Sequence, residues 1–374
     1  MTGLGVSVVV PVYNGLPYLE RCLASLVGQD LAPEEYEVVA VDDGSSDGSG
    51  AVLDAFAAAH PNFRVIHQEN SGWPGQPRNI GTDVARGEFV LYVDADDRLA
   101  SNTLRRLLTF AHQNGSDIVV LGTIKIDGDK IVAVRNCAGL RPTAPLTAVF
   151  RSLTCHKLVR RALLTEYGIR FPEGKVTYED GIFLAQVAPR AGRISVMGDQ
   201  AYYVKDAGID RGGISRQRRP FMRERTESVL RILDTLRELT GDQRAVDPIA
   251  IRLHHLLVRS WRPRRFLEFS SEYQDQAVAL RQQLIRRHVP PGADRDLDPQ
   301  ELRRSLAFAS GKGSVVRALA RFERDKRSAA WLREPRVLPI LARAGLIHRA
   351  ARRRAPAPRP RSETRSRPRI PPMA

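Results

Sequence analysis

The first third of the chain alternates apolar runs with amphipathic segments at short intervals, and this alternation constrains the fold more than any other feature. Residues 6–12 (VSVVVPV) form a continuous apolar run, as expected for a strand buried on both faces. Strands are also predicted at 37–43, 63–68, 88–93 and 117–126, and helices at 47–60, 76–86 and 101–114. Leu19, Cys22, Leu23 and Leu26 mark one face of a further helix after the first strand. Strands that alternate with helices of this length predict an α/β domain with a mainly parallel sheet.

The pattern changes along the chain, and the changes predict its domains. An α/β domain is expected at 1–215, with a nucleotide half at about 1–126 and an acceptor half of looser pattern at about 127–215. A helical region is expected at 216–345, with helices at 221–239, 248–261, 271–288, 299–308 and 314–327. Residues 346–374 are rich in arginine and proline, and we expect this tail to be disordered.

Composition excludes several classes of protein. Hydrophobic residues make up 43% of the 374, which excludes a wholly disordered chain. No uninterrupted apolar stretch approaches the ~20 residues of a membrane-spanning helix. The amino end lacks a basic region and a cleavage site, so no secretory signal peptide is predicted. Three widely spaced cysteines favour neither disulfides nor a zinc site, and a cytoplasmic location is expected.

The net charge of +16 is unevenly distributed. From Arg349 to Ala374 there are nine arginines and one acidic residue, Glu363. This tail is either an arm for anionic lipid, polymer or nucleic acid, or a solubilising segment, and both interpretations stay open. Trp261 and Trp331 lie among arginines in the helical region, which is compatible with a membrane surface or with ordinary helix packing.

Acidic residues follow two of the predicted strands. Asp42 and Asp43 end the second strand, and Asp94, Asp96 and Asp97 follow the strand at 88–93. The carboxyl ends of parallel strands meet at one edge of a sheet, where ligands bind. So many acids at one edge would repel one another without a cation, and oxygen ligands favour Mg²⁺ or Mn²⁺. Such ions bind together with substrate phosphates, which points to a nucleotide diphosphate.

Four motifs in the first hundred residues resemble those of family 2 glycosyltransferases with the GT-A fold. The motifs are VVVPVYN at 8–14, VDDGSSD at 41–47, PRNIG at 77–81 and VDADD at 93–97. The resemblance covers about residues 5–215 and does not extend to the helical region or the tail. It implies a metal-dependent enzyme that transfers a sugar from a nucleotide donor, with UDP-sugar as the expected donor.

The resemblance also implies roles for individual residues of the donor site. Pro11 and Tyr13 would line the base pocket, and Asp43 would accept a hydrogen bond from uracil. Asn70 and Arg78 would contact the nucleotide or the sugar, and the guanidinium of Arg78 suits phosphate. In the Asp-x-Asp element, Asp94 would reach the ribose or sugar, and Asp96 would hold the metal that bridges both phosphates.

The second half of the α/β domain supplies a candidate catalytic base. In the family, the second acid of a Glu-Asp pair deprotonates the acceptor hydroxyl, and the sequence Tyr178-Glu179-Asp180-Gly181 maps this role to Asp180. Proton removal in the transition state contributes ~10²–10⁴-fold. Glu179 is the secondary candidate, and both acids could instead serve only to stabilise a helix start. A single displacement would invert the anomeric configuration.

A second set of segments is similar to enzymes that glycosylate cell-wall teichoic acids. The segments are NSGWPGQPRN at 70–79, HKL at 156–158 and IRFPE at 169–173. Their acceptor is an anionic polyol-phosphate polymer, which suits an arginine-rich chain. The stretch 210–215 (DRGGIS) lacks the histidine with which that group often binds the metal. Arg211 and Ser215 could meet the diphosphate as a closing loop or form a plain turn.

The sequence therefore predicts an inverting glycosyltransferase that acts on a cell-envelope polymer or glycan. Its expected partners are a nucleotide-sugar donor, a glycan or anionic polymer acceptor and, peripherally, an anionic membrane, with no nucleic acid. Two alternatives stay open. A nucleotidyltransferase would show a glycine-rich basic loop after the first strand, and residues 14–17 (NGLP) do not form one. A non-enzymatic binder of anionic polymer or nucleic acid would not need acids at the sheet edge.

Overall fold

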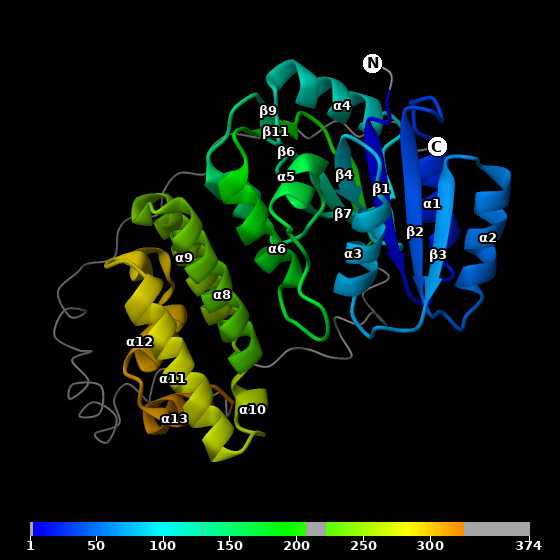
Figure 1. Ribbon diagram of the computed structural model, residues 1–374. Helices are drawn as coiled ribbons and strands as arrows, with labels where there is room; N and C mark the ends of the chain where they lie inside the picture. Colours follow the sequence, from blue (N-terminus) through cyan, green and yellow to red (C-terminus); the bar gives the residue numbers. More distant parts are fainter. Residues whose placement is uncertain (1–2, 129, 207–221, 325–374) are drawn as a thin grey trace. The chain divides into compact units, whose positions relative to one another are not determined.

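The computed structural model describes residues 3–128, 130–206 and 222–324 (Figure 1). Within these residues the chain forms two compact units, one of residues 3–206 with 234–242 and the other of residues 222–233 with 243–324. Helix α8 (Met222–Thr240) contributes to both units. The first unit contains two β-sheets and the second is helical, so the predicted succession of an α/β part and a helical part is confirmed.

The large sheet of the first unit has eight strands, and those of the amino-terminal half run parallel (Figure 1). In spatial order the strands are β3 (Phe63–Gln68), β2 (Tyr36–Asp43), β1 (Val6–Val12), β4 (Phe89–Tyr92), β10 (Lys157–Arg160), β6 (Ile118–Leu121), β11 (Ile194–Gly198) and β9 (Gly139–Arg141). Strand β10 lies antiparallel between β4 and β6, with Leu158 opposite both Leu91 and Val119. The segment before β10 is therefore brought to the end of β4.

Helices cover both faces of this sheet, which explains the β-branched runs in its central strands. The helices are α1 (Leu19–Val27), α2 (Ser49–Ala59), α3 (Gly75–Val84) and α4 (Thr103–Asn114). Val6, Val8 and Val10 of β1 belong to one core cluster with Leu23 of α1 and Leu107 of α4. Val9 points to the other face, where Gly81 of α3 lies against it. Alternating side chains thus anchor α3 on the face opposite α1 and α4.

A second, four-stranded sheet lies beyond the end of β4. Its strands are β5 (Arg98–Leu99), β12 (Tyr203–Asp206), β7 (Thr123–Asp127) and β8 (Lys130–Arg135), in that order. The predicted single strand 117–126 is wrong, because the chain divides at Gly122 into β6 and β7 and passes between the two sheets. A Cβ at Gly122 would collide with the backbone of Gln200, so this crossing requires glycine.

Shorter helices complete the first unit. They are η1 (Leu146–Arg151), α5 (Arg161–Glu166), α6 (Glu179–Val187) and η2 (Ala188–Arg190). Helix α6 begins at Glu179 after Tyr178, whose backbone has a φ of 54°. The two predicted acidic residues, Glu179 and Asp180, therefore stand in the first helical turn.

The second unit consists of helices around an apolar core. After α8 come α9 (Gln243–Arg259), α10 (Pro263–Phe266), α11 (Ser271–His288), η4 (Ala293–Asp296), α12 (Pro299–Ala309) and α13 (Gly313–Arg324). Trp261 is 4% exposed and packs with its ring centroid 5.4 Å from that of Phe308. Trp261 is therefore packed among helices, which is one of the two interpretations that the sequence left open. Trp331 and the predicted tail lie outside the described residues.

Helix α9 begins five residues before the predicted start at Pro248. Proline cannot donate to the carbonyl oxygen four residues earlier, which belongs to Arg244. Arg244 is exposed in the first turn, where water can satisfy that carbonyl group, so the helix continues through the proline. In the part of the chain that the structure describes, no helix combines the length and the apolar character needed to cross a membrane.

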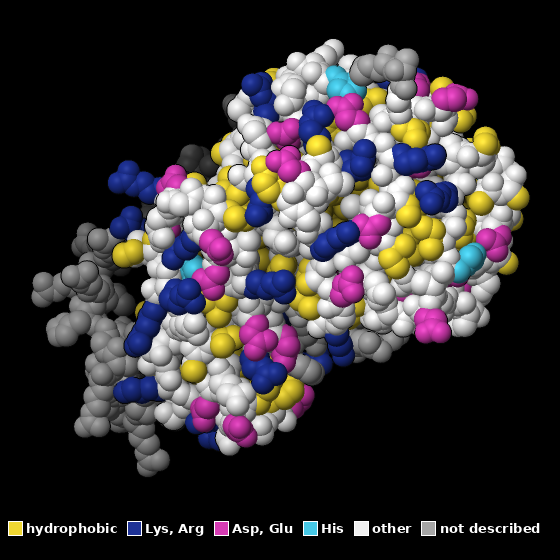
Figure 2. All heavy atoms as spheres, in the orientation of Figure 1, with side chains coloured by type: hydrophobic (Ala, Val, Ile, Leu, Met, Phe, Trp, Pro, Cys, Tyr) yellow, Lys and Arg dark blue, Asp and Glu magenta, His cyan; other side chains and the backbone are white. Residues whose placement is uncertain are grey.

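Charged side chains on the face shown in Figure 2 are mixed in sign. Lysine and arginine lie among aspartate and glutamate over this face, without a single large basic patch. Basic and acidic side chains of the described residues are thus interspersed on the face shown.

Gly87 lies in the segment before β4, where the backbone passes very close to β1. Its N–H donates to Ser7 Oγ at 2.8 Å, and a Cβ there would lie 2.6 Å from the carbonyl carbon of Val6. Because backbone rather than a flexible side chain fills that space, Gly87→Ala is expected to lower the free energy of unfolding by about 1–3 kcal/mol. Urea denaturation followed by circular dichroism measures the change.

Gly3→Ala is the matched control, because a Cβ at Gly3 meets nothing within 4 Å. This variant should stay within about 0.5 kcal/mol of the wild type. Equal stability of the two variants would contradict the packing described for β1.

Candidate active site

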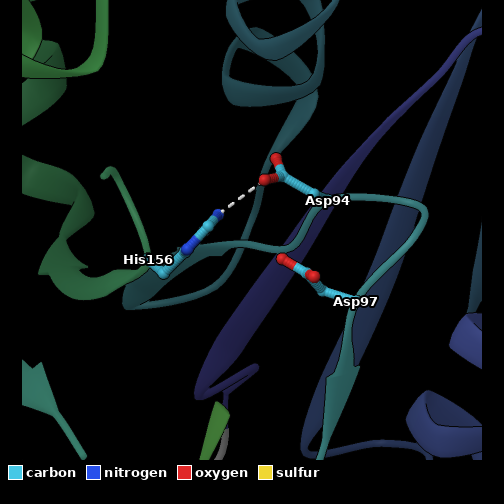
Figure 3. Close-up of side chains that lie close together, drawn as sticks. All are labelled: Asp94, Asp97 and His156. Atoms are coloured by element: carbon cyan, nitrogen blue, oxygen red, sulfur yellow. Dashed lines mark hydrogen bonds and ion pairs between the residues drawn. The ribbon is translucent and has the colours of Figure 1, made fainter. Parts of the chain in front are cut away.

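The acids after β4 meet a histidine from the segment before β10. Asp94, Asp97 and His156 each offer one ligand atom, and the three atoms lie within 4.8 Å of one another (Figure 3). The antiparallel pairing of β10 with β4 explains this proximity, since it carries His156 to the end of β4. An imidazole thus lies beside acidic groups that the sequence predicts at the carboxyl edge of the sheet.

Asp94 is surrounded by hydrogen-bond donors and positive charge. Its Oδ1 accepts from Arg78 Nη2 at 2.8 Å, and its Oδ2 accepts from His156 Nε2 at 2.9 Å. Lys205 Nζ lies 3.7 Å from the same Oδ2. Burial alone would raise the pKa of Asp94, but the hydrogen bond from His156 and the charges of Arg78 and Lys205 outweigh it and hold the pKa well below its usual range.

His156 is buried and neutral at physiological pH. Burial, together with the charge of Lys205, lowers its pKa to about 4. Its ring stacks on that of Tyr203, with centroids 4.1 Å apart and planes 12° apart. The neutral ring donates its Nε2–H to Asp94, and its Nδ1 has no hydrogen-bond partner among the residues that the structure describes. The imidazole therefore fixes the direction of the Asp94 carboxylate.

Asp97 lies deeper than Asp94 and belongs to the same network. Its Oδ2 accepts a hydrogen bond from the Tyr203 hydroxyl at 2.8 Å and lies 3.2 Å from Lys205 Nζ. Burial raises its pKa to about 7, against the attraction of Lys205, and the negative charges of Asp94 and Asp96 act in the same direction as burial. Tyr203 Oη also accepts from the Asp94 backbone N–H at 3.1 Å, which ties the two acids together.

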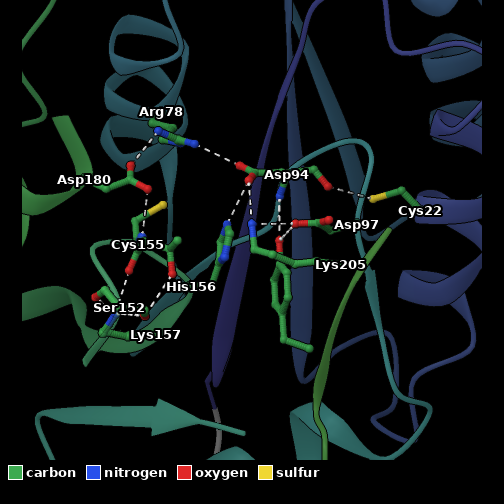
Figure 4. A network of polar contacts seen from close by, with 12 residues as sticks. Cys22, Arg78, Asp94, Asp97, Ser152, Cys155, His156, Lys157, Asp180 and Lys205 are labelled. Carbon is green, nitrogen blue, oxygen red and sulfur yellow. Dashed lines mark hydrogen bonds and ion pairs between the residues drawn. The ribbon is translucent and has the colours of Figure 1, made fainter. Parts of the chain in front are cut away.

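Arg78 connects this donor-side cluster to the start of α6 (Figure 4). It is 4% exposed. Its Nη2 binds Asp94, while its Nη1 binds Asp180 Oδ1 at 2.8 Å and lies 3.6 Å from Glu179 Oε1. Both terminal nitrogens are thus engaged by protein carboxylates. The predicted contact of Arg78 with donor phosphate stays a prediction, and the structure shows a second task, which is to hold two acids in place.

Asp180 is fixed from two sides. Arg78 holds one oxygen, and the backbone N–H of Cys155 donates to the other at 3.0 Å. Lys157 Nζ donates to the carbonyl oxygen of Thr154 at 2.6 Å and so fixes the loop that carries Cys155 (Figure 4). Since a carboxylate has about four acceptor positions, Asp180 retains the capacity to accept a proton or a further hydrogen bond.

Glu179 is the second acid in the first turn of α6. Burial raises the pKa of Glu179 to about 7, and the negative charge of Asp180 acts in the same direction, while Arg78 opposes both. A pKa near neutrality suits a general base. The first turn of α6 therefore offers two acids, Asp180 bound to Arg78 at 2.8 Å and Glu179 with a pKa near neutrality.

The residues predicted for a nucleotide base lie around the ends of β1 and β2. Asp43 accepts hydrogen bonds from Gln68 Nε2, from the Ser71 N–H at 2.9 Å and from Ser71 Oγ at 2.9 Å. Asn70 Nδ2 donates to the carbonyl oxygen of Asp43 at 3.0 Å, so these two predicted residues are brought together. Tyr13 is 44% exposed just after the end of β1, where its ring can receive a stacking partner.

Two residues, Pro11 and Gly44, shape the backbone around the ends of β1 and β2. Pro11 pairs with Val41 in the β1–β2 register, and it is only partly buried. Gly44 has a φ of +70°, and a Cβ there would lie 2.8 Å from the Asn70 amide nitrogen. Only glycine combines this backbone conformation with such a close approach to Asn70.

The donor set at the end of β4 fits a divalent cation. Two carboxylates and an imidazole are ligands that Mn²⁺ accepts, and Mg²⁺ favours the oxygens. Among the described residues the cluster comprises Asp94, Asp97 and His156, and Asp96 is not part of it. The assignment of Asp96 as metal ligand stays a prediction. Arg211 and Ser215 lie outside the described residues.

Sequence reasoning missed Asp97, His156, Lys205 and Cys155 as site residues. Asp97 stood in the acidic run, and His156 stood in one of the segments used for the teichoic-acid resemblance, so signals existed for both. Lys205 sits on a short strand with no motif around it, and Cys155 acts through its backbone N–H. Neither of these two carries a recognisable sequence signal.

Two family models match the chain. Residues 7–163 match the model described as Glycosyl transferase family 2, and residues 223–320 match the one described as Glycosyl transferase TarS linker domain. The predicted resemblance to family 2 and to teichoic-acid glycosyltransferases is confirmed by these matches together with the relatives below.

Several similar proteins are named as poly(ribitol-phosphate) glycosyltransferases. A poly(ribitol-phosphate) beta-glucosyltransferase of Bacillus spizizenii is 37% identical over 201 residues, which are 53% of this chain and 32% of that protein. The poly(ribitol-phosphate) beta-N-acetylglucosaminyltransferase TarS of Staphylococcus aureus is 36% identical over 203 residues, which are 53% of this chain and 35% of that protein. The matched part thus spans about a third of the length of these relatives.

A solved structure resembles nearly the whole described chain. The crystal structure of the 1–349 segment of Staphylococcus aureus TarS in complex with UDP-GlcNAc has a TM-score of 0.73 and 27% identity. The similarity covers 86% of this chain and 92% of that chain. The predicted fold class, a GT-A unit with a mainly parallel sheet followed by a helical region, is confirmed.

Glu179 makes the stability of the fold depend on pH. Its pKa is 4.5 ordinarily and about 7 in the folded chain, so between these values the folded state binds more protons than the unfolded state. Stability therefore falls as the pH rises from about 4.5 to about 7. Glu179→Gln should remove this loss and raise the free energy of unfolding by roughly 1–3 kcal/mol at pH 8, and by much less at pH 5.

Thermal and urea denaturation at the two pH values measure this difference. Glu34→Gln, at an exposed position, is the matched control and should show no such dependence on pH. A Glu179→Gln variant that is less stable than the wild type at pH 8 would show that Glu179 is held as a favourable carboxylate, contrary to its burial.

Proposed function

We propose that this chain, whose residues 7–163 match the model of glycosyl transferase family 2, transfers a sugar from a nucleotide donor to a hydroxyl group of an anionic cell-envelope polymer. One observation carries the proposal. The acidic edge of the sheet and a candidate base on α6 are joined through the single guanidinium of Arg78, at 2.8 Å on each side. This arrangement occurs in a chain that is similar to a UDP-GlcNAc complex of TarS.

A UDP-sugar is the donor that we propose. Asp43 uses three hydrogen bonds within the protein, and one of its roughly four acceptor positions remains for a ring N–H of uracil. Tyr13 would stack on the base and Pro11 would line the same pocket, beside Asn70. The diphosphate would then extend toward Asp94 and Asp96, and Arg211 and Ser215 stay candidates for closing over it.

A divalent ion, Mn²⁺ or Mg²⁺, would stabilise the charge of the departing nucleoside diphosphate when bound. Asp94, Asp97 and His156 are the residues that would hold it, with Asp96 as the further candidate from the sequence. Asp94 is already ionised and oriented by its neighbours, so it needs little rearrangement to bind a cation.

The reaction itself would be a single displacement with inversion at the anomeric carbon. Asp180 is our candidate base. It takes the proton of the acceptor hydroxyl while that oxygen bonds to the anomeric carbon, and the bond to the diphosphate breaks with its electron pair. Arg78 keeps Asp180 oriented before this step. Glu179 is the alternative base, because its pKa of about 7 lies near the operating pH.

The proposed acceptor is a polyol-phosphate polymer. The names of the relatives support this class, as does the match of residues 223–320 to the TarS linker domain. A chain with a net charge of +16 also suits a polyanion. We place the reaction in the cytoplasm, with peripheral contact at the inner face of the membrane, because nucleotide sugars and a membrane-linked polymer would meet there.

The direct test uses the full chain with UDP-GlcNAc or UDP-glucose and poly(ribitol phosphate). The wild type should label the polymer and release UDP. Asp180→Asn should lower kcat by ~10²–10⁴-fold, because proton removal is lost, while UDP binding measured by calorimetry is retained. Asp127→Asn, which makes the same change at the exposed end of strand β7, should leave both values unchanged.

The possible outcomes separate the alternatives. Near-normal transfer by Asp180→Asn, with loss of transfer in Glu179→Gln, would move the base to Glu179. Release of pyrophosphate instead of UDP would indicate a nucleotidyltransferase. A wild type that binds no UDP but binds polyanions with a steep salt dependence would refute the enzyme and favour the polymer binder.

A further inference from the structure

Lys205 places a positive charge within the acidic edge of the sheet. It lies on β12, and its Nζ is 3.2 Å from Asp97 Oδ2 and 3.7 Å from Asp94 Oδ2 (Figure 4). The same ammonium lies 5.7 Å from the centroid of the Tyr203 ring. One side chain thus contacts both carboxylates of the cluster at the end of β4.

These two carboxylates are also the oxygen ligands of the candidate cation site. With His156 they offer three ligand atoms within 4.8 Å of one another. Protein oxygens bind Mg²⁺ and Mn²⁺ at about 2.0–2.2 Å. An ion bound to Asp97 Oδ2 and Asp94 Oδ2 would therefore meet an ammonium that already contacts the same atoms. The two cations repel each other and share the same negative charge.

We propose that Lys205 is a tethered cation that neutralises Asp94 and Asp97 and weakens the binding of a divalent ion at this site. The lysine stabilises the acidic cluster when no ion is bound. Entry of an ion requires the ammonium to withdraw from the two carboxylates. The side chain is 27% exposed, so a path toward solvent is open to it.

The surroundings of Lys205 favour this role over simple surface charge pairing. Asp97 is 4% exposed and accepts a hydrogen bond from the Tyr203 hydroxyl. Lys205 is a cation close to Asp97 that compensates the charge of its carboxylate. Asp94 has Arg78 in addition, which stays bound to Oδ1. Removal of the lysine would therefore leave negative charge that a divalent ion could compensate.

The inference goes beyond sugar transfer, because it concerns only the occupancy of the acidic cluster by cations. It is tested with Mn²⁺ alone, in the absence of donor and acceptor. The dissociation constant of Mn²⁺ is measured by electron paramagnetic resonance of the free ion and by calorimetry, so the result does not depend on whether the chain transfers a sugar.

Lys205→Met should bind Mn²⁺ about tenfold more tightly than the wild type, since a nearby like charge has been removed. Lys205→Arg keeps the positive charge and should retain the weak binding of the wild type. Lys130→Met removes a lysine from the exposed edge strand of the same sheet and should leave the constant unchanged. If Lys205 had only a structural role, Lys205→Met would not bind Mn²⁺ more tightly than Lys205→Arg.

Equal or weaker Mn²⁺ binding by Lys205→Met would overturn the proposal. Circular dichroism and thermal denaturation check that the variants are folded. If Lys205→Met does not fold, Lys205→Gln provides the same comparison with a polar side chain, and tighter Mn²⁺ binding is again required.

Discussion

The buried guanidinium of Arg78 is the interaction on which the rest of the site depends. A charge that is 4% exposed is tolerated only when ion pairs and hydrogen bonds compensate it. Asp94 compensates it from the end of β4 and Asp180 from the first turn of α6, each at 2.8 Å. Helix α3, which carries Arg78, packs against β1 through Gly81. The sheet therefore fixes the guanidinium, and the guanidinium fixes both acids.

This bridge relates the two halves of the proposed reaction. Asp94 belongs to the side that would receive the diphosphate, and Asp180 belongs to the side that would receive the acceptor proton. Because both carboxylates share one cation in a region of low exposure, a change of charge at either one alters the potential at the other. Lys205, which pairs with Asp97, is a second cation on the donor side. The negative charge of the acidic cluster is therefore balanced by protein groups as much as by solvent.

The sequence predicted the features that depend on local pattern. Continuous apolar runs identified β1 and β2, and the acids that follow strands identified Asp94 and the neighbourhood of Asp43. It did not predict contacts that depend on long-range pairing. His156 reaches the site because β10 inserts antiparallel beside β4, and Lys205 reaches it because β12 pairs with β5 and β7. No periodicity within a single segment encodes such pairings.

A double-mutant cycle on Arg78 and Asp180 tests the central claim most directly. The free energies of unfolding of wild type, Arg78→Met, Asp180→Asn and the double variant are measured by urea denaturation at pH 7. The account predicts a coupling energy on the order of 2 kcal/mol, with the double variant more stable than the two single losses would give, because each single change leaves a buried charge uncompensated. Additive losses within about 0.5 kcal/mol would show that the two groups are independent and would contradict the bridge.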